Sequence, residues 1–182
     1  MSKKIIAILG LPGSGKSEAI NYLIKKYNWP KVYFGEVTFD EMRARRLEIN
    51  EKNEREVRED LRAKYGQLHY AKQVIKKIED LPSDVVLVES LYSWPEYLEF
   101  KNKFGDNFIA ITVYSSPKTR YERLGKRSVR PLTPEEGKSR DYSQIENLTQ
   151  ANPIAIADYT VINEDSLEYL YRQLDQIIKN LL

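Results

Sequence analysis

Residues 5–17 read IIAILGLPGSGKS, and this stretch decides the fold class. Ile5 to Leu9 form a continuous apolar run, the pattern of a strand that is buried on both faces of a parallel sheet. A turn cluster of glycines and a proline follows at once, and behind it apolar residues recur at helical spacing from Ala19 to Ile24. The order of strand, glycine-rich loop and helix indicates an α/β protein.

Four further segments have the composition of strands. The apolar runs at 84–89 and 108–114 repeat the buried pattern, and residues 31–34 and 159–162 are shorter candidates. Because helical spacing separates these runs, we expect five strands that alternate with helices.

Helical patterns fill the remaining chain. Between residues 38 and 81 apolar residues keep three- and four-residue steps, which predicts two or three helices with Gly66 as a break. Thr38 and Glu41 have the spacing of a capping box, so the first of these helices is expected to begin at Thr38. An amphipathic stripe from Ser166 onward predicts a last helix, whose apolar side packs either on the sheet or on a second copy of the chain.

Length and composition exclude several classes of protein. The 182 residues suffice for one sizeable core, so we expect a single domain over residues 1–182. The formal net charge of +2 argues against nucleic-acid binding driven by bulk charge. The chain has no cysteine and a single histidine, His69, which removes disulfides, thiolate nucleophiles and thiolate or histidine metal sites. No apolar run is long enough for a membrane span or a signal peptide, so a cytoplasmic protein without a membrane partner is expected.

The glycine-rich loop has the pattern of a phosphate-binding loop, Gly10-x4-Gly15-Lys16-Ser17. Glycines let the backbone turn with its amides directed inward, where a side chain would clash with a phosphate. Lys16 can reach the β- and γ-phosphates, the hydroxyl of Ser17 can ligate Mg²⁺, and the helix presents its positive N-terminal end. We therefore expect ATP and Mg²⁺ as cofactors, held by Gly10, Pro12, Gly13, Ser14, Gly15, Lys16 and Ser17.

Two glutamates, Glu36 and Glu89, fall at the C-terminal ends of candidate parallel strands. Doubly wound sheets bind their ligands at the carboxyl ends of the strands, so both are candidate catalytic residues. Either could hold Mg²⁺ or accept the proton of an attacking hydroxyl, and we assign Glu89 to the metal together with Ser17. The alternative for Glu89 is a carboxylate that caps the next turn or pairs with a lysine.

Several further segments resemble the nucleoside-monophosphate-kinase branch of the P-loop proteins, and in particular an archaeal-type group related to adenylate kinase and dephospho-CoA kinase. The resemblance implies a three-layer P-loop kinase fold with a five-stranded parallel sheet of order 2-3-1-4-5 flanked by helices. It also implies an arginine-bearing lid at about residues 128–140, an acceptor-side helical region at about 38–81, and adenine packed near Asn163. The segments that carry it, besides the phosphate loop, are Gly35-Glu36-Val37, Arg120-Tyr121-Glu122-Arg123-Leu124, Arg127, Arg140-Asp141 and residues 157–164.

Arginines are the candidate residues for the lid side. Arg123 and Arg127 are four residues apart on one expected helix face, where two guanidinium groups could clamp γ-phosphate oxygens during transfer. The alternative is surface pairing with Glu122. Arg130 and Arg140 lie in or beside the polar segment 126–141, which we interpret as a loop that leaves the core.

The acceptor side departs from the family pattern. The second strand usually ends in Gly-Asp, with an arginine three residues later that grips the acceptor phosphate, whereas this chain has Phe39 at the place of the arginine. After the third strand the usual Asp-Gly-x-Arg is replaced by Glu89-Ser90-Leu91-Tyr92. An acceptor without a phosphate therefore becomes conceivable. The alternative is substitution from the neighbouring helix by Arg43, Arg45 or Arg46.

Three functions remain open from these residues. The first is an ATP-dependent small-molecule kinase with a nucleotide or nucleoside-like phosphoryl acceptor. The second is a dephospho-CoA-kinase-like enzyme, and the third is a nucleotide-binding regulatory protein with little transfer activity. A GTPase is disfavoured because no Asn-Lys-x-Asp segment follows the later strands, and the sequence leaves the oligomeric state open.

Overall fold

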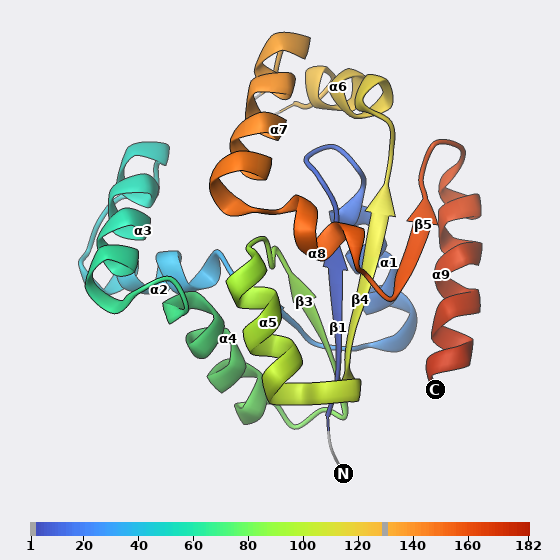
Figure 1. The fold of residues 1–182 in the computed structure, drawn as a ribbon, viewed down its shortest axis with the longest axis horizontal. Coiled ribbons are helices and arrows are strands. Elements are labelled where there is room, and N and C mark those ends of the chain that lie inside the picture. The colour runs from blue at the N-terminus through green and yellow to red at the C-terminus, as the bar shows by residue number, and fades with distance from the viewer. Residues whose placement is uncertain (1–2, 129–130) are drawn as a thin grey trace.

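A five-stranded parallel sheet forms the centre of the computed structural model, which describes residues 3–128 and 131–182 (Figure 1). The strand order β2-β3-β1-β4-β5 confirms the order 2-3-1-4-5 that the resemblance implied. The predicted lid residue Arg130 lies outside the described residues. The strands are β1 (Lys4–Leu9), β2 (Lys31–Tyr33), β3 (Val85–Glu89), β4 (Phe108–Tyr114) and β5 (Tyr159–Ile162).

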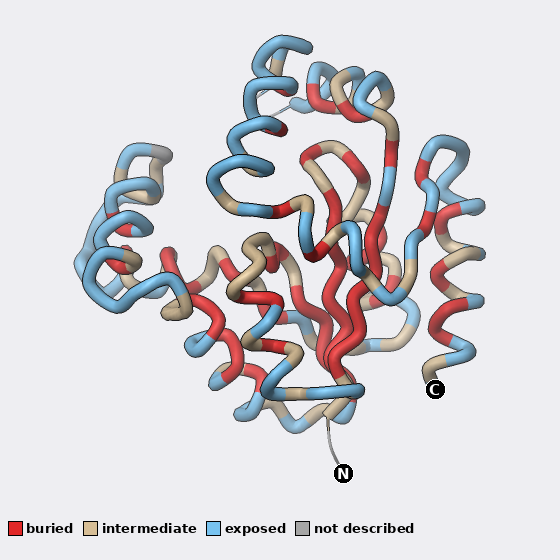
Figure 2. The backbone as a smooth tube through the Cα atoms, viewed as in Figure 1, coloured by how far each residue is buried: buried red, intermediate tan, exposed pale blue. Residues whose placement is uncertain are grey.

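Both faces of the sheet are buried, as the continuous apolar runs predicted (Figure 2). Alternate side chains of a strand point to opposite faces. Ile5, Ala7 and Leu9 of β1 therefore enter one core cluster, and Ile6 and Ile8 enter the other. As the central strand, β1 pairs with β3 on one side and β4 on the other.

Helices cover the two faces and make a three-layer structure (Figure 1). One face carries α2 (Glu36–Ala44), α4 (His69–Asp80), α5 (Trp94–Phe104) and the short α8 (Ala151–Ala155), and a 3₁₀ turn at Gly105–Asn107 follows α5. The other face carries α1 (Lys16–Tyr27) and α9 (Leu167–Leu181).

Helix α9 packs its apolar stripe on the sheet. Ser166 caps the helix by accepting from the backbone N–H of Tyr169, and Leu170, Leu174 and Ile178 are buried in the same core cluster as β1. The sequence allowed this apolar side to pack either on the sheet or on a second copy of the chain. In the structure it packs on the chain's own sheet. Within the described residues, no helix combines the length and apolarity that crossing a membrane requires.

Three helices rise beyond the carboxyl edge of the sheet: α3 (Glu51–Tyr65), α6 (Pro117–Gly125) and α7 (Pro134–Leu148). In Figure 1, α6 and α7 lie above the loop between β1 and α1, and α3 stands at the left beside α2. The expectation of a polar loop over residues 126–141 is wrong from Pro134 onward. Thr133 and Glu136 form a reciprocal capping box that starts α7, a polar helix whose exposed side needs no apolar residues.

The start of α2 also differs from the prediction. The helix begins at Glu36, and Thr38 lies inside it. The Thr38 side chain is buried, and its hydroxyl hydrogen-bonds the hydroxyl of Tyr70 at 2.8 Å. Thr38 therefore joins α2 to α4 instead of capping a helix. The break at Gly66 is confirmed, since Gly66 follows α3 with φ of 85°.

Candidate nucleotide site

The loop at residues 10–15 turns tightly between β1 and α1 because glycines permit its backbone angles. Gly13 has φ of 81°, and a Cβ there would lie 2.7 Å from the backbone oxygen of Arg120. Gly15 has φ of 100°, and its Cβ would overlap Nδ2 of Asn163. Left-handed angles and close neighbours together exclude side chains at both positions.

Asn163 holds this loop from behind. The side chain is 3% exposed, and its Nδ2 donates to the backbone oxygen of Ser14 at 2.7 Å. Ser115 Oγ donates to the backbone oxygen of Asn163 at 2.6 Å, which fixes the asparagine in turn. Asn163 does not line the cavity described next, and its Nδ2 supports the backbone of the phosphate loop. Its predicted contact with the cofactor, through adenine packed near it, stays a prediction.

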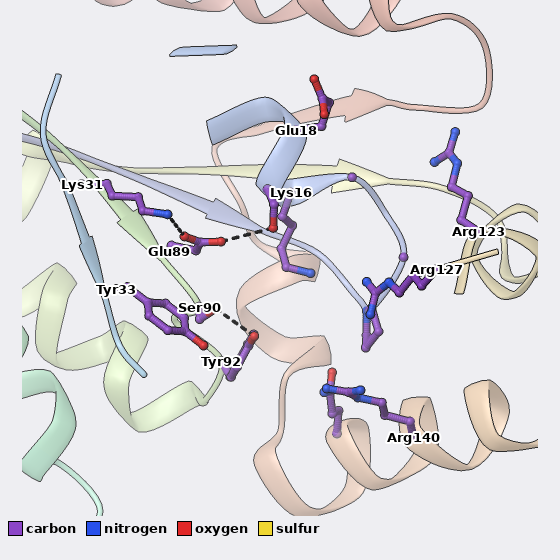
Figure 3. Close-up of a pocket in the computed structure, with 15 residues that line it drawn as sticks. Lys16, Glu18, Lys31, Tyr33, Glu89, Ser90, Tyr92, Arg123, Arg127 and Arg140 are labelled. Atoms are coloured by element: carbon purple, nitrogen blue, oxygen red, sulfur yellow. Dashed lines mark hydrogen bonds and ion pairs between the residues drawn. The ribbon is translucent and has the colours of Figure 1, made fainter. Parts of the chain in front are cut away.

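A cavity of about 510 Å³ opens at the carboxyl edge of the sheet, in front of the loop (Figure 3). It collects residues from β1–α1, β2, β3, α6 and α7, which are far apart in the sequence. Gly10 and Ser14 are not part of its lining, because they lie on the inner side of the loop, where Gln150 donates to the Gly10 carbonyl oxygen. The predicted residues that line the cavity are Pro12, Gly13, Gly15, Lys16, Ser17, Glu89, Arg123, Arg127 and Arg140.

Positive charge dominates the lid side of this cavity. In Figure 3 the charged ends of Lys16 and Arg127 approach each other across the open space, with Arg140 below them. Arg123 contributes from α6 and donates from Nη1 to Ser115 Oγ at 3.0 Å. Arg127 lies beyond Gly125, where α6 ends, so the two arginines do not share one helix face as predicted, although both line the cavity. Such a concentration of cations around inward-directed backbone amides suits a polyphosphate.

Lys16 is shielded from solvent, and this changes its titration. Burial, reinforced by the positive charge of Arg127, lowers the pKa of Lys16 from 10.5 to about 8, against the opposing effect of Glu89. Its Nζ donates to the backbone oxygen of Leu11 at 3.1 Å. A bound polyphosphate would supply the missing negative charge and restore the higher pKa.

Triphosphate binding is therefore expected to take up a proton above pH 8. Below that pH Lys16 is charged with or without ligand, so its titration adds no pH dependence. Above it, the empty site loses the proton and the filled site keeps it, so affinity for Mg-ATP falls by up to about tenfold per pH unit. Calorimetry at about pH 9 in two buffers of different ionisation enthalpy measures the uptake. The prediction is contradicted if Mg-ATP affinity at about pH 9 equals that below pH 8 and no proton is taken up. The control is Lys25→Ala on the same helix, which should show the same proton uptake as the wild type.

An oxygen pair at the end of β3 can hold a divalent cation. Ser17 Oγ donates to Glu89 Oε1 at 3.2 Å, and Lys31 Nζ is 2.6 Å from Glu89 Oε2 (Figure 3). A hydroxyl and a carboxylate are hard oxygen ligands, and Mg²⁺ is commonly bound by one or two protein groups together with substrate phosphates. The pair fits Mg²⁺, although Lys31, which the sequence did not single out, neutralises one carboxylate oxygen.

Glu36 is not brought to this cavity. The chain leaves β2 at Tyr33 and enters α2 at Glu36, so the glutamate projects from the first helical turn. There it forms an ion pair with Arg43, a surface contact. Of the two candidate glutamates, only Glu89, the last residue of its strand, lies among the phosphate-site residues, and a catalytic role of Glu36 stays a prediction.

Arg120 and Asp141 form the buried support of the site. Both guanidinium Nη atoms of Arg120 donate to Asp141, at 2.9 and 2.6 Å, and Nη1 also donates to the Pro12 carbonyl oxygen at 3.1 Å. Both side chains are at most 5% exposed. This pair connects the phosphate loop, α6 and α7. Neither residue was predicted to have a role, although Arg120 precedes the apolar Leu124 by one helical turn, which marks the inward face of α6.

These features define a class: a P-loop protein with a kinase-like fold. Residues 6–143 match a family model described as an AAA domain. The chain is 32% identical to a UPF0200 protein of Thermococcus sibiricus over 97% of this chain and 95% of that protein, and 35% identical to one of Methanocaldococcus jannaschii over 98% and 90%. The chain therefore belongs to the UPF0200 family.

Solved structures support the same fold. The protein TT1252 from Thermus thermophilus superposes with a TM-score of 0.70 at 18% identity, with full coverage of both chains. A gluconokinase from Sinorhizobium meliloti gives 0.62 at 13% identity, covering 98% of this chain and 95% of that one. A shikimate kinase from Acinetobacter baumannii in complex with shikimate gives 0.59 at 16%, covering 99% and 96%. At these identities the likeness shows the fold alone.

Proposed function

We propose that this protein is an ATP-dependent small-molecule kinase, which transfers the γ-phosphoryl group of Mg-ATP to a hydroxyl group of an acceptor. The observation that carries the proposal is the convergence of Lys16, Arg127 and Arg140 on one cavity beside the Ser17–Glu89 oxygen pair. A nucleotide or nucleoside-like acceptor is the starting expectation for its substrate.

Phosphoryl transfer depends mainly on position and charge stabilisation, because little covalent help is needed. The acceptor oxygen forms a bond to the γ-phosphorus while the bond from that phosphorus to the β–γ bridging oxygen breaks, and ADP leaves with the electron pair. Lys16 stabilises the charge on the moving group together with Arg123, Arg127 and Arg140. Glu89 is the carboxylate at the site that could take the acceptor's hydroxyl proton, as the alternative to holding the metal. A Mg²⁺ ion at Ser17 and Glu89 would neutralise phosphate charge when bound.

The test is ATP consumption by the purified protein with Mg²⁺ and a panel of acceptors. The panel contains nucleoside monophosphates, nucleosides, dephospho-CoA, gluconate and shikimate, the last two because kinases named for them share this fold. Acceptor-stimulated turnover supports the kinase, and stimulation by dephospho-CoA alone supports the dephospho-CoA-kinase-like alternative. Tight ATP binding with no stimulation by any acceptor would overturn the kinase in favour of a regulatory nucleotide-binding protein.

Arg127→Ala is expected to lower turnover on the order of a hundredfold while Mg-ATP affinity changes much less. Its guanidinium lies beside Lys16, where it can act on charge that develops only during transfer. Steady-state kinetics with ATP titration separate the two effects. Arg172→Ala on the distant α9 is the matched control. If the Arg127 variant turns over at the wild-type rate, Arg127 is a surface charge without a role in phosphoryl transfer.

A further inference from the structure

A second hollow of about 100 Å³ adjoins the nucleotide cavity on the side of α3 and α4. The two share Tyr33, Ser90 and Tyr92 as a common wall, so a group in the hollow is next to the transfer site. Ser90 has φ of 68°, an uncommon angle for a serine, at the point where β3 turns into this wall. Backbone strain of this kind concentrates at functional sites.

Arg43, Arg45 and Arg46, the alternative candidates for the missing acceptor grip, do not line this hollow. Arg43 forms ion pairs with Glu36 and Asp40, and Arg45 forms ion pairs with Glu41 at 2.7 Å and Asp60 at 2.5 Å. These pairs hold both guanidinium groups on the outer surface of α2. Arg46, just after α2, is exposed and does not line the hollow either.

Two other arginines, Arg58 and Arg62 of α3, line the hollow. They are one helical turn apart and therefore face the same way. The Arg62 guanidinium stacks over the Tyr70 ring at 5.3 Å, which orients it without using its N–H donors. Among the described side chains, neither arginine forms an ion pair with a carboxylate. Forked donors with free N–H groups match the planar oxygens of a carboxylate or a phosphate.

The rest of the lining suits hydroxyl groups. Tyr33, Tyr92 and Thr38 bring hydroxyls, of which that of Tyr92 donates to Ser90 Oγ at 2.9 Å and that of Thr38 bonds Tyr70. The side chain of Glu96 is 2% exposed, and one of its oxygens accepts from the Ser93 backbone at 3.1 Å. Burial raises the pKa of Glu96. The hollow is also small beside the nucleotide cavity, about 100 against about 510 Å³. It has room for a compact polar molecule.

We propose that this hollow is the acceptor subsite, and that Arg58 and Arg62 bind an oxyanion of a small, hydroxyl-bearing acceptor. The two α3 arginines replace the grip that the family pattern places at Phe39 and Tyr92. The inference rests on the proposed kinase function and names its substrate class: a compact hydroxy compound that carries a carboxylate or phosphate.

The kinetic experiment compares anionic acceptors with neutral ones of similar size. Gluconate and shikimate test the carboxylate, AMP and CMP test the phosphate, and glucose and adenosine are the neutral counterparts. We expect only anionic compounds to stimulate ATP consumption. Arg58→Ala and Arg62→Ala should each raise KM for the acceptor on the order of ten- to a hundredfold and leave KM for ATP unchanged. Arg55→Ala, an exposed arginine of the same helix outside the hollow, is the matched control.

A binding experiment separates the inference from the proposed function. The phosphate loop is first saturated with Mg²⁺ and a non-hydrolysable ATP analogue, and each acceptor is then titrated by calorimetry. Binding of an anionic compound that Arg58→Ala/Arg62→Ala abolishes supports the subsite even if no turnover is found. Equal use of neutral acceptors, unchanged KM in both variants, or no anionic ligand bound to the saturated protein would overturn it. Arg62→Lys keeps the charge without the fork, and intermediate binding by it supports bidentate recognition.

Discussion

Lys16→Ala is expected to lower ATP turnover by about two to three orders of magnitude and to weaken triphosphate binding. Lys16 follows the phosphate loop directly and lines the cavity, and its Nζ donates to the backbone oxygen of Leu11 in that loop. Alanine leaves the helix intact, because it is the best helix former. Steady-state ATP consumption and direct titration of Mg-ATP measure the two effects.

Lys25→Ala is the control for this variant. It removes the same charge from the same helix α1, outside the nucleotide cavity. Loss of activity in both variants would mean that the loss of one positive charge from α1, and not the position of Lys16, lowers activity. Undiminished turnover with Lys16→Ala would refute the assignment of the phosphate loop. Thermal unfolding of the Lys16 variant should show no loss of stability, because burial disfavours its charge in the empty protein.

The sheet and the phosphate loop could be predicted because their signals are local. Each central strand is an uninterrupted apolar run, and Gly10-x4-Gly15-Lys16-Ser17 occupies a contiguous segment. The helix start at Thr38 was wrong for a related reason. Its capping-box spacing is local, but its hydroxyl bonds Tyr70, which is 32 residues away. A long-range contact of this kind leaves no spacing in the sequence.

The two glutamates show the same limit within the site. In the sequence Glu36 and Glu89 both fall at the C-terminal end of an expected strand, but β2 ends at Tyr33, whereas β3 includes Glu89 as its last residue. Glu36 lies three residues beyond the end of β2, and this distance places its carboxylate in the first turn of α2 instead of at the sheet edge. The sequence could not predict that Arg58 and Arg62 line a hollow, because a polar helix has the same sequence pattern whether its arginines face solvent or a binding site.

Arg120→Ala is expected to destabilise the fold by roughly 3–5 kcal/mol, since it leaves the buried carboxylate of Asp141 without a cationic partner. The same change removes the hydrogen bond to the Pro12 carbonyl, so the phosphate loop loses its connection to α6. Tyr121, whose hydroxyl donates to Asp141 at 2.9 Å, can satisfy only one of the remaining oxygens. Urea unfolding of the wild type and the variant gives the difference in free energy.

Two further variants decide whether the pair itself is responsible. Arg123→Ala removes a partly exposed arginine three residues along the same helix, and its free energy of unfolding should stay within about 1 kcal/mol of wild type. Arg120→Met/Asp141→Leu removes both charges, and because no uncompensated charge then remains buried, it should recover much of the loss. If the double variant is no more stable than Arg120→Ala, the cost comes from the freed loop backbone at Pro12. In that case Mg-ATP, which binds the folded loop, should restore stability to Arg120→Ala more than to the wild type.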